Sequence, residues 1–334
     1  MKILICSSVF YPAIGGIENL TLFLSQEFVK AGHQVKVITG QKQDKPLDKI
    51  EVVRTRSWVR QMRLFLWCDV FFMPNITLKG VWLMGLNFRR KWVISHNDFH
   101  LMHSGWWKAN LKMFFIKKAH LNIAVSQSVS HSLKVDSRVI YNCYDDDVFK
   151  IYPGIERDID FVFVGRLVSQ KGCSMLLDAL ALLGGNYTLS IIGDGAEMTD
   201  MQIKAQALGL ADRVMFTGFL GHEELAMALG RHKVMVVPSV DLEGFGIVAL
   251  EGLACGCELI VSDAGGLPEA IVGQGRIFPM GDVEKLTELM REIITSKDLN
   301  KMDADRTKFL EEHSKAATAK RYLEAFRQLL KRSV

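Results

Sequence analysis

The 334-residue chain is 49% hydrophobic and 23% charged, a composition that excludes an intrinsically disordered protein and, at roughly 150 residues per domain, suggests two domains. No uncharged apolar run reaches the roughly 18–20 residues that span a bilayer. The net charge of +4 does not indicate a nucleic-acid binder, but residues 1–150 carry a net +10 and residues 151–334 a net −6. This asymmetry indicates that the first half faces an anionic surface.

The first half alternates predicted strands and helices. The apolar run Ile3–Ser7 is predicted to be a strand and not a signal peptide, because no cleavage site follows it. A helix is predicted over residues 17–31 and ends at Gly32. Further predicted strands are Val35–Ile38, Val70–Met73, Trp92–Ser95, Asn122–Val125 and Arg138–Tyr141. The six cysteines form no CxxC pair, which is typical of reduced thiols in a cytoplasmic protein.

A second alternating series begins at the strand Asp160–Val164 and runs to a mostly helical C-terminal tail. Its further predicted strands are Thr188–Ile192, Arg213–Phe216, Lys233–Pro238 and Glu258–Ser262, and its helices are 172–182, 197–208, 222–229 and 246–254. Apolar strands joined by helices form parallel sheets that are covered on both faces. The sequence therefore predicts an α/β protein with two Rossmann-like domains. Because ligands of such sheets bind at the carboxyl ends of the strands, the expected site is the cleft between the domains.

Three loops that follow predicted strands carry residues suited to a phosphorylated ligand, and the third of them belongs to the stretch from Pro238 to Glu251. Gly15 and Gly16 would let backbone N–H groups approach a phosphate, although a tight turn alone would also explain them. They are not part of a G-x-G-x-x-G fingerprint, so a nicotinamide or flavin cofactor is not indicated. Arg166 and Lys171 place a planar fork and a mobile point charge where a diphosphate would lie; ordinary exposed loop charges are the alternative.

The stretch from Pro238 to Glu251 is the most specific in the chain. A buried strand ends in a loop that holds Glu243, and a helix begins near Gly246 with free N–H groups that can hold an anion. Glu251 lies one to two turns into that apolar helix, where a carboxylate is costly unless it is paired or meets a ligand. The two carboxylates can thus reach opposite ends of one ligand.

These motifs resemble those of retaining GT-B glycosyltransferases, specifically glycosyltransferase family 4 (glycosyl transferases group 1). The resemblance covers nearly the whole chain. The matching motifs are Gly-Arg-(x)4-Lys-Gly at 165–172, Ile-Gly-Asp-Gly at 192–195, Phe-Thr-Gly-Phe-Leu at 216–220, Glu-x7-Glu at 243–251 and Asp-Ala-Gly-Gly-Leu-Pro-Glu at 263–269. The family usually has a proline seven residues after the second glutamate, where this chain has Glu258, so the course of that loop is expected to differ.

The resemblance implies a GT-B fold and assigns roles to individual residues. It implies an acceptor-binding domain at 1–145, a linker at 146–158, a donor-binding domain at 159–312 and a helix at 313–334 that returns to the first domain. Arg166 and Lys171 would neutralise the diphosphate, Glu243 would contact the transferred sugar and Glu251 the ribose. The expected catalytic residues are His96, Arg166, Lys171 and Glu243, and the expected donor-binding residues are Gly15, Gly16, Gly165, Gly193, Phe219, Leu220, Gly244, Phe245, Gly246, Ile247, Val248 and Glu251.

His96 and the residues around it also carry an alternative. The family places a histidine near the reacting face of the sugar, and His96 follows a predicted strand. With Asp98, His100 and His103 it could also suggest zinc. Since retaining GT-B enzymes need no metal and have no cofactor, we expect none here, and His100 and His103 are expected to contact the acceptor or solvent. The run Asp145-Asp146-Asp147 is expected to be structural.

Residues 51–118 hold 12 Lys and Arg against three acidic residues, together with all six tryptophans. This composition is typical of a face that contacts anionic membranes, although some of the tryptophans could instead be core residues. The resemblance therefore predicts a cytoplasmic, peripherally membrane-associated hexosyltransferase. It would use a nucleotide-diphosphate sugar, UDP-linked by preference, and a glycan or lipid-linked glycan acceptor of surface polysaccharide synthesis. The alternatives are a phosphorylase or nucleotide-sugar epimerase of the same fold, and a non-catalytic glycan- or lipid-binding protein.

Overall fold

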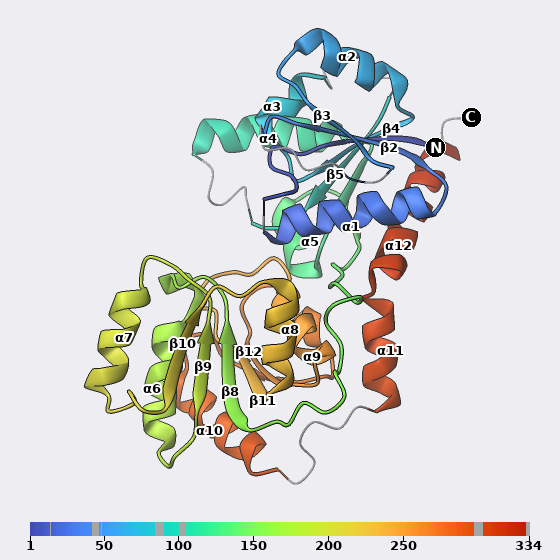
Figure 1. Cartoon of the computed structure of the whole chain (residues 1–334). Coiled ribbons are helices and arrows are strands. Elements are labelled where there is room, and N and C mark those ends of the chain that lie inside the picture. The colour runs from blue at the N-terminus through green and yellow to red at the C-terminus, as the bar shows by residue number, and fades with distance from the viewer. Residues whose placement is uncertain are drawn as a thin grey trace. The chain divides into compact units, whose positions relative to one another are not determined.

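The computed structural model describes residues 1–13, 15–41, 47, 49–83, 90–99, 105–296 and 303–331. The chain divides into two compact units. Figure 1 colours the chain by residue number, so that both units can be followed in it. Unit 1 comprises Met1–Cys143 and His313–Val334, and unit 2 comprises Tyr144–Glu312. The chain thus leaves unit 1 two residues before the predicted end of the first domain, and the segment expected to be a linker forms part of unit 2.

Unit 1 is built on a seven-stranded parallel sheet with the order β3-β2-β1-β4-β5-β6-β7. Its strands are β1 (Lys2–Cys6), β2 (Gln34–Thr39), β3 (Glu51–Arg54), β4 (Val70–Pro74), β5 (Lys91–His96), β6 (Leu121–Ala124) and β7 (Arg138–Val139). The inner strand β1 pairs Ile3 with both Val35 and Val70, and its apolar residues are buried on both faces. The short β3 was not predicted, and β7 is two residues shorter than expected.

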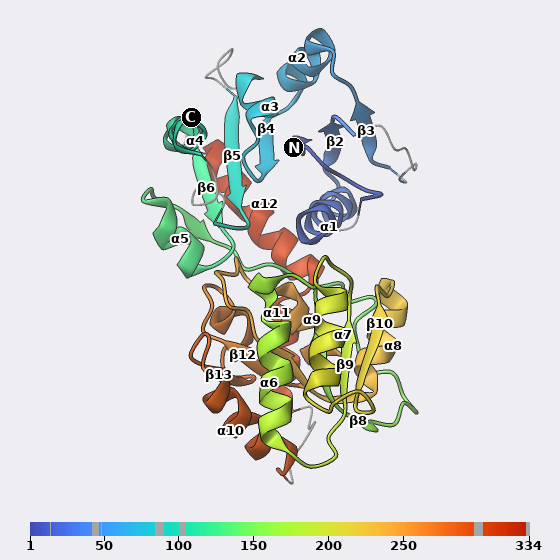
Figure 2. The ribbon, with the colours of Figure 1, turned by 90° about the vertical axis from the view of Figure 1, so that its left-hand side faces the viewer.

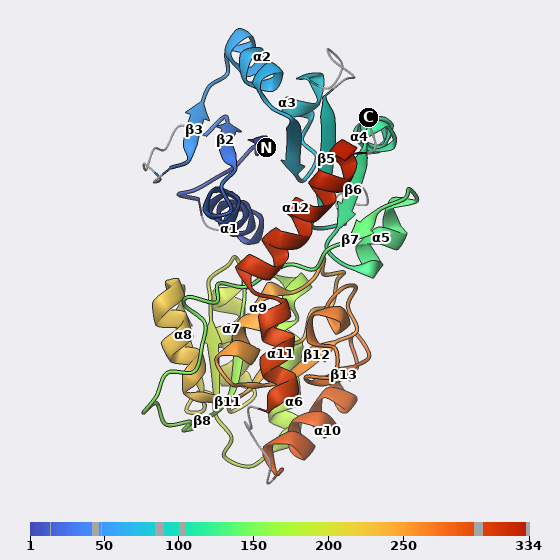
Figure 3. The same cartoon turned by 90° about the vertical axis from the view of Figure 1, so that its right-hand side faces the viewer.

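Helices cover both faces of this sheet. One face packs against α1 (Gly16–Lys30) and the C-terminal α12 (Lys315–Lys331), and the other against α2 (Trp58–Trp67), α3 (Leu78–Val81) and α4 (Trp106–Lys118); α5 is Gln127–Leu133. The ring centroids of Phe28 and Phe326 lie 5.8 Å apart, and those of Phe72 and Tyr322 lie 5.6 Å apart. Figure 3 shows α12 crossing the sheet of unit 1 beside α1, so the last helix completes the core of the first unit.

Unit 2 is built on a six-stranded parallel sheet with the order β10-β9-β8-β11-β12-β13. The strands are β8 (Ile159–Val164), β9 (Leu189–Ile192), β10 (Val214–Gly218), β11 (His232–Val237), β12 (Glu258–Ser262) and β13 (Arg276–Phe278). The strand order reverses between β8 and β11, and in open α/β sheets ligands bind in the crevice outside the carboxyl ends at this point. Together with unit 1, this architecture confirms the predicted α/β fold of two Rossmann-like parallel sheets.

The helices of unit 2 lie on both faces of its sheet, as Figure 2 shows for α6 and α7 on one side. They are α6 (Cys173–Leu183), α7 (Met198–Ala207), α8 (His222–Gly230), α9 (Ile247–Ala254), α10 (Val283–Ile294) and α11 (Ala304–Glu312), with 3-10 turns at Ser169–Lys171 and Pro268–Ile271. Residues of α6, α7 and α10 share one core with the sheet. On α9, a Cβ at Gly252 would lie 2.2 Å from Met235 Sδ, so glycine lets this helix approach β11 closely.

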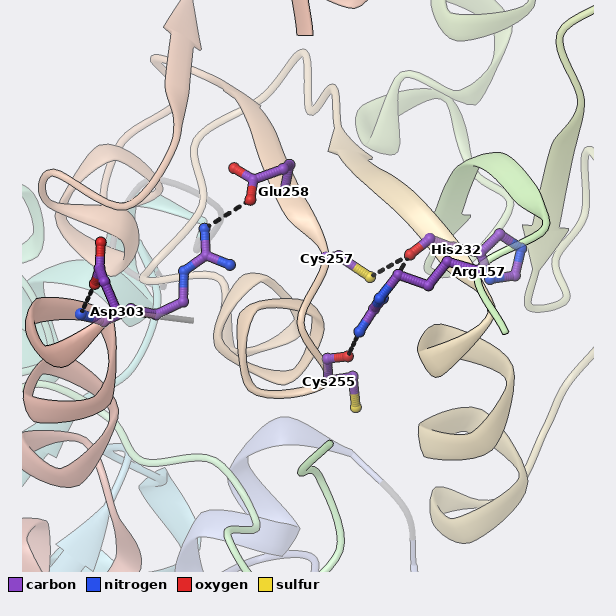
Figure 4. A network of polar contacts seen from close by, with 7 residues as sticks. Arg157, His232, Cys255, Cys257, Glu258 and Asp303 are labelled. Atoms are coloured by element: carbon purple, nitrogen blue, oxygen red, sulfur yellow. Dashed lines mark hydrogen bonds and ion pairs between the residues drawn. The ribbon is translucent and has the colours of Figure 1, made fainter. Parts of the chain in front are cut away.

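The start of β11 and the end of α9 are tied to the segment that enters unit 2 (Figure 4). Arg157 donates from Nη1 to the carbonyl of His232 at 2.8 Å and from Nη2 to the carbonyl of Cys255 at 2.6 Å. Glu258, which stands where the resemblance leads one to expect proline, accepts a hydrogen bond from Arg306 Nη2 at 3.0 Å. The departure from the family motif is therefore accommodated by an ion pair that joins β12 to α11.

Candidate active site

Five loops at the carboxyl edge of the unit 2 sheet are joined by backbone hydrogen bonds. The N–H of Leu167 donates to the carbonyl of Asp194 at 2.9 Å, and that of Gly193 to Gly218 at 2.8 Å. Across the switch point, the N–H of Val240 donates to Gln170 at 2.9 Å. The loop after β12 is joined to them by the N–H of Gly266, which donates to the backbone carbonyl of Glu243 at 2.7 Å. The motifs singled out in the sequence thus meet at one edge of one sheet.

Two glycines permit the closest approaches between these loops. At Gly172, with φ +70°, a Cβ would lie 1.8 Å from the carbonyl oxygen of Pro238. At Gly193, with φ +136°, a Cβ would lie 2.0 Å from the carbonyl oxygen of Gly165. Only glycine combines these backbone angles with these contacts. The predicted donor-binding glycines Gly165 and Gly193 therefore lie against one another.

At the switch point, Lys171 and Glu243 form an ion pair between Nζ and Oε1. The same Oε1 accepts a hydrogen bond from Ser239 Oγ at 2.7 Å. The carbonyl of Ser239 in turn accepts from Ser262 Oγ at 2.7 Å. The structure thus brings together two of the predicted catalytic residues and adds Ser239, a buried hydroxyl that the sequence analysis missed. The sequence feature that could have identified Ser239 is its position four residues before Glu243, the first glutamate of the Glu-x7-Glu motif.

Arg166 lies two residues after the end of β8 and is exposed, so its guanidinium is available to a ligand at this edge. Phe219 and Leu220 lie beyond β10 at the same edge, and the Phe219 side chain is 61% exposed. An aromatic ring that protrudes from a strand end offers a flat apolar surface, which suits a nucleotide base. These residues occupy the rim of the predicted donor site.

The helix α9 begins at this edge, with Gly246 as its N-cap in the left-handed region at φ +91°. The first N–H groups of a helix carry partial positive charge and have no partner inside the helix, so they favour an anion. No acidic residue lies in the first turn to neutralise them. Gly244 and the buried Phe245 lead into this turn, and Ile247 and Val248 open it, as the donor-binding prediction requires of a phosphate-holding segment.

Glu251 lies on α9 and is half-buried. Burial raises the pKa of its carboxyl to about 7, and the nearby charge of Asp145 raises it further in the same direction. A carboxyl that titrates near neutral pH within an apolar helix is a candidate for ligand contact, because hydroxyl donors would stabilise its charged form. Asp145, the first residue of the Asp145–Asp147 run, thus affects the electrostatics of Glu251.

In unit 1, Gly15 is the N-cap of α1, with an extended backbone at φ 174°, and Gly16 is the first residue of the helix. A Cβ at Gly15 would lie 2.2 Å from Glu18 Oε2, which is the end of a flexible side chain. The paired glycines therefore form the strand-to-helix turn that the sequence predicted.

His96 ends β5 and is 0% exposed. Its Nε2 lies 3.0 Å from Asn122 Oδ1 on β6, so the ring is held inside the unit. Two residues later, Asp98 Oδ2 accepts a hydrogen bond from Asn75 Nδ2 at 3.1 Å, and Asn75 has a φ of +93°. This sparsely populated conformation at the end of β4 places Asn75 to orient Asp98, and neither role was predicted.

Asp98 lines a cavity of about 350 Å³ at the switch point of the unit 1 sheet, between the ends of β1 and β4. Lys112 also lines it, and burial lowers the pKa of its ammonium while Asp98 opposes that shift. Asp98 is thus a half-buried carboxyl that lines this cavity, whereas His96 is buried inside unit 1.

Among the described residues, no group of three or more His, Cys, Asp or Glu side chains is arranged to hold a metal ion. No described helix is long and apolar enough to cross a membrane. His100 and His103, which were expected to contact acceptor or solvent, lie outside the described residues. All six cysteines are free and buried.

Residues 146–309 match the protein family described as glycosyl transferases group 1. The chain is 28% identical to an uncharacterized glycosyltransferase of Methanocaldococcus jannaschii, MJ1607, over 81% of this chain and 83% of that protein. A second glycosyltransferase of the same organism, MJ1178, is 32% identical over 56% of this chain, which spans only 54% of its length.

Solved structures agree on the fold over the whole chain. Anabaena Alr3699/HepE in complex with UDP superimposes with a TM-score of 0.82 at 20% identity, covering 98% of this chain and 100% of that one. The same protein in complex with UDP-glucose gives a TM-score of 0.73. Residues 146–309 therefore form a glycosyl transferases group 1 domain, and the chain as a whole has the fold of GT-B glycosyltransferases.

Proposed function

We propose that the protein is a retaining hexosyltransferase that moves a hexose from a UDP-linked donor to a hydroxyl of a glycan or lipid-linked glycan in surface polysaccharide synthesis. The observation that carries this proposal is the Lys171–Glu243 ion pair, oriented by Ser239 at the switch point of unit 2. The complexes of HepE with UDP and with UDP-glucose support a uridine donor. The donor would need no metal, because two cations and the start of α9 face the same edge.

The chemistry is a substitution on one face of the sugar. The bond between the anomeric carbon and the diphosphate oxygen breaks, and a bond to the acceptor oxygen forms on the same face through an oxocarbenium-like state. The acceptor hydroxyl loses its proton to the departing diphosphate, so no further base is required. Charge develops on the diphosphate, and fixed cations stabilise that charge in the transition state.

The carboxylate of Glu243 forms an ion pair with Lys171 and so neutralises its charge. A bound diphosphate supplies a stronger anion for Lys171, which releases Glu243 to accept hydrogen bonds from hydroxyls of the transferred sugar. Ser239 holds Glu243 in place during this exchange. Arg166 would add its planar fork to the same diphosphate.

The test is nucleotide release from a panel of UDP-, GDP- and ADP-linked hexoses in the presence of mixed saccharide acceptors. We expect UDP release to exceed the others and Lys171→Ala to lower it about a hundredfold or more, as for loss of a transition-state donor. The matched control is Lys204→Ala, because Lys204 also pairs with a carboxylate in unit 2 and its side chain is 28% exposed against 27% for Lys171. It should keep near-normal activity.

Four results would overturn the proposal. Absence of release with every donor, together with a melting temperature that UDP leaves unchanged, would favour a non-catalytic binding protein. Conversion of the sugar without an acceptor would indicate an epimerase, and dependence on inorganic phosphate a phosphorylase. Inverted configuration at the anomeric carbon of the product would contradict the retaining mechanism.

We also propose that unit 1 contacts an anionic membrane at the cytoplasmic face through α4. Its Trp106 and Trp107 side chains are 84% and 59% exposed, whereas Trp92 is buried in the core of unit 1. Leu111 and Phe114 add exposed apolar surface along the helix, which carries four lysines and no acidic residue. Exposed aromatic rings beside lysines favour the headgroup region of anionic lipids.

Membrane contact is tested by sedimentation with vesicles of phosphatidylglycerol and phosphatidylcholine, and of phosphatidylcholine alone. We expect binding to the anionic vesicles that weakens as salt rises. The double variant Trp106→Ala, Trp107→Ala should lose this binding. Ile203→Ala is the control, since Ile203 is 59% exposed on α7 in unit 2. Equal binding by the double variant, or binding to neutral vesicles only, would contradict the assignment.

A further inference from the structure

Unit 1 contains a second, larger cavity that no part of the donor chemistry uses. It measures about 680 Å³ and lies at the carboxyl ends of β1, β2 and β3, on the opposite side of β1 from the switch point. It adjoins the Asp98 cavity, because Ser7, Ser8, Val9 and Thr77 line both. A ligand that fills the larger cavity can therefore extend towards Asp98.

Aromatic rings and small polar groups line this cavity. Trp58, at the start of α2, is 67% exposed, and Trp82 is half-buried. Hydroxyl and amide side chains, among them Thr55 and Gln61, make up much of the rest. Among the described residues that line it, Arg56 is the one that carries a charge. Flat apolar rings beside hydrogen-bonding groups suit a ligand that has both a C–H face and hydroxyls, and the cation adds a preference for negative charge.

Hydrogen bonds hold several of these groups in place before any ligand arrives. Gln61 Nε2 donates to the carbonyl of Thr55 at 3.0 Å, which fixes α2 to the end of β3. Gln41 Oε1 accepts from the N–H of Phe10 at 3.0 Å, which joins the loops after β2 and β1. A site whose polar groups are already ordered loses less conformational entropy when it binds.

We propose that this cavity binds an anionic sugar ring of the acceptor, with the ring stacked on Trp58 and its carboxylate or phosphate paired with Arg56. This inference rests on the proposed function, because it assigns the acceptor to unit 1. The ring held here is not the one that receives the hexose. The next ring along the acceptor would reach the Asp98 cavity, so the acceptor is an anionic glycan of at least two units.

The test uses three probes without donor: digalacturonic acid, glucose 1-phosphate and lactose, each titrated by NMR against the full chain. We expect at least one anionic probe to bind about fivefold or more tightly than lactose. Arg56→Gln should remove that difference, and Trp58→Ala should weaken every probe about tenfold or more. Trp106→Ala is the matched control and should bind like the wild type, since Trp106 is an exposed tryptophan on α4 that does not line the cavity; it is 84% exposed, against 67% for Trp58.

The outcomes separate the two sources of the charge. Preference for digalacturonic acid assigns a uronic acid, and preference for glucose 1-phosphate assigns a sugar phosphate. Equal binding of lactose, no binding of any probe, or normal binding by Trp58→Ala would overturn the inference. Melting temperature with UDP is measured on the same variants: if UDP fails to stabilise the wild type while the anionic probes bind, the donor proposal fails and the carbohydrate cavity remains.

Discussion

The carboxyl edges of the two sheets are built on the same strand arrangement but in opposite ways. In unit 2, backbone hydrogen bonds join the loops, and glycines lie at their closest contacts. In unit 1, the loops leave cavities of about 680 and 350 Å³ lined by side chains. A backbone-built edge suits a group common to many ligands, such as a phosphate, while an edge built from side chains suits one particular ligand. The proposed function makes the same distinction, because it combines a donor of a widely shared type with an individual acceptor.

The largest expected effect is on the free energy of unfolding. It is tested by comparing two glycines that follow corresponding strands of the two sheets, Gly193 after β9 and Gly40 after β2. Gly193→Ala places a Cβ 2.0 Å from the carbonyl oxygen of Gly165, at a φ of +136°. We expect it to lower the free energy of unfolding by about 3 kcal/mol or more, because neither backbone can move aside. Gly40→Ala meets nothing within 4 Å and should change it by about 0.5 kcal/mol at most.

Thermal and urea unfolding of both variants measure this difference. Gly184→Ala serves as a control for backbone strain alone, since Gly184 has φ +69° but open space around its Cβ. It should cost about 1 kcal/mol. Similar losses for Gly193→Ala and Gly40→Ala would remove the distinction between the two edges.

A smaller effect is expected from Glu251, the half-buried carboxyl on α9 in unit 2. Because the pKa of Glu251 is raised to about 7 in the folded chain, the native state binds more protons than the unfolded state between about pH 4.5 and 7. The stability that this carboxyl contributes is therefore present in acid and is lost as the pH rises through 7. This loss should amount to about 2 kcal/mol of the free energy of unfolding, and Glu251→Gln should abolish it.

Urea unfolding at pH 5 and pH 8 tests this sign. The wild type should lose more stability between these two values than Glu251→Gln does, after correction for titrations common to both proteins. Glu269→Gln, a change of charge in the same unit, is the comparison. A variant with the same pH dependence as the wild type would show that the Glu251 carboxyl has an ordinary pKa.

The smallest effect concerns the orientation of Glu243. Ser239→Ala removes the 2.7 Å hydrogen bond to Glu243 Oε1 but leaves the ion pair with Lys171. We expect about a tenfold loss of kcat, equivalent to about 1.4 kcal/mol, with little change in UDP affinity. Ser239→Thr, which retains a hydroxyl, should recover part of the rate. An unchanged kcat in Ser239→Ala would show that Glu243 does not need this partner.

Much of the fold followed from local patterns, and the failures have identifiable causes. Apolar strands such as Val70–Met73 were predicted because fully buried parallel strands are continuously apolar. The helix α4 was missed because most of its side chains are exposed and it has no apolar stripe to mark a buried face. The strand β3 was missed because four residues, Glu51–Arg54, are too short to show a period.

For the site, residue types and their spacing sufficed to single out Lys171, Glu243 and the glycines of unit 2. What they could not indicate were contacts made across the fold. Ser239 touches Glu243 because the loop bends back over four residues, and Asn75 meets Asp98 because two neighbouring strands end at one level. Such contacts depend on the positions of whole strands, which a local pattern does not contain.

The sequence by itself determined the two alternating series, the phosphate-directed loops and the excess of positive charge in the first half. Only the tertiary structure decided which tryptophans of this positively charged half lie at the surface. Trp92 lies in the core, Trp58 lines a cavity, and Trp106 and Trp107 are exposed on α4. The physical reason is that composition counts side chains, whereas burial depends on which helix face the sheet covers. The positive charge of the first half therefore lies beside exposed tryptophans in different parts of unit 1.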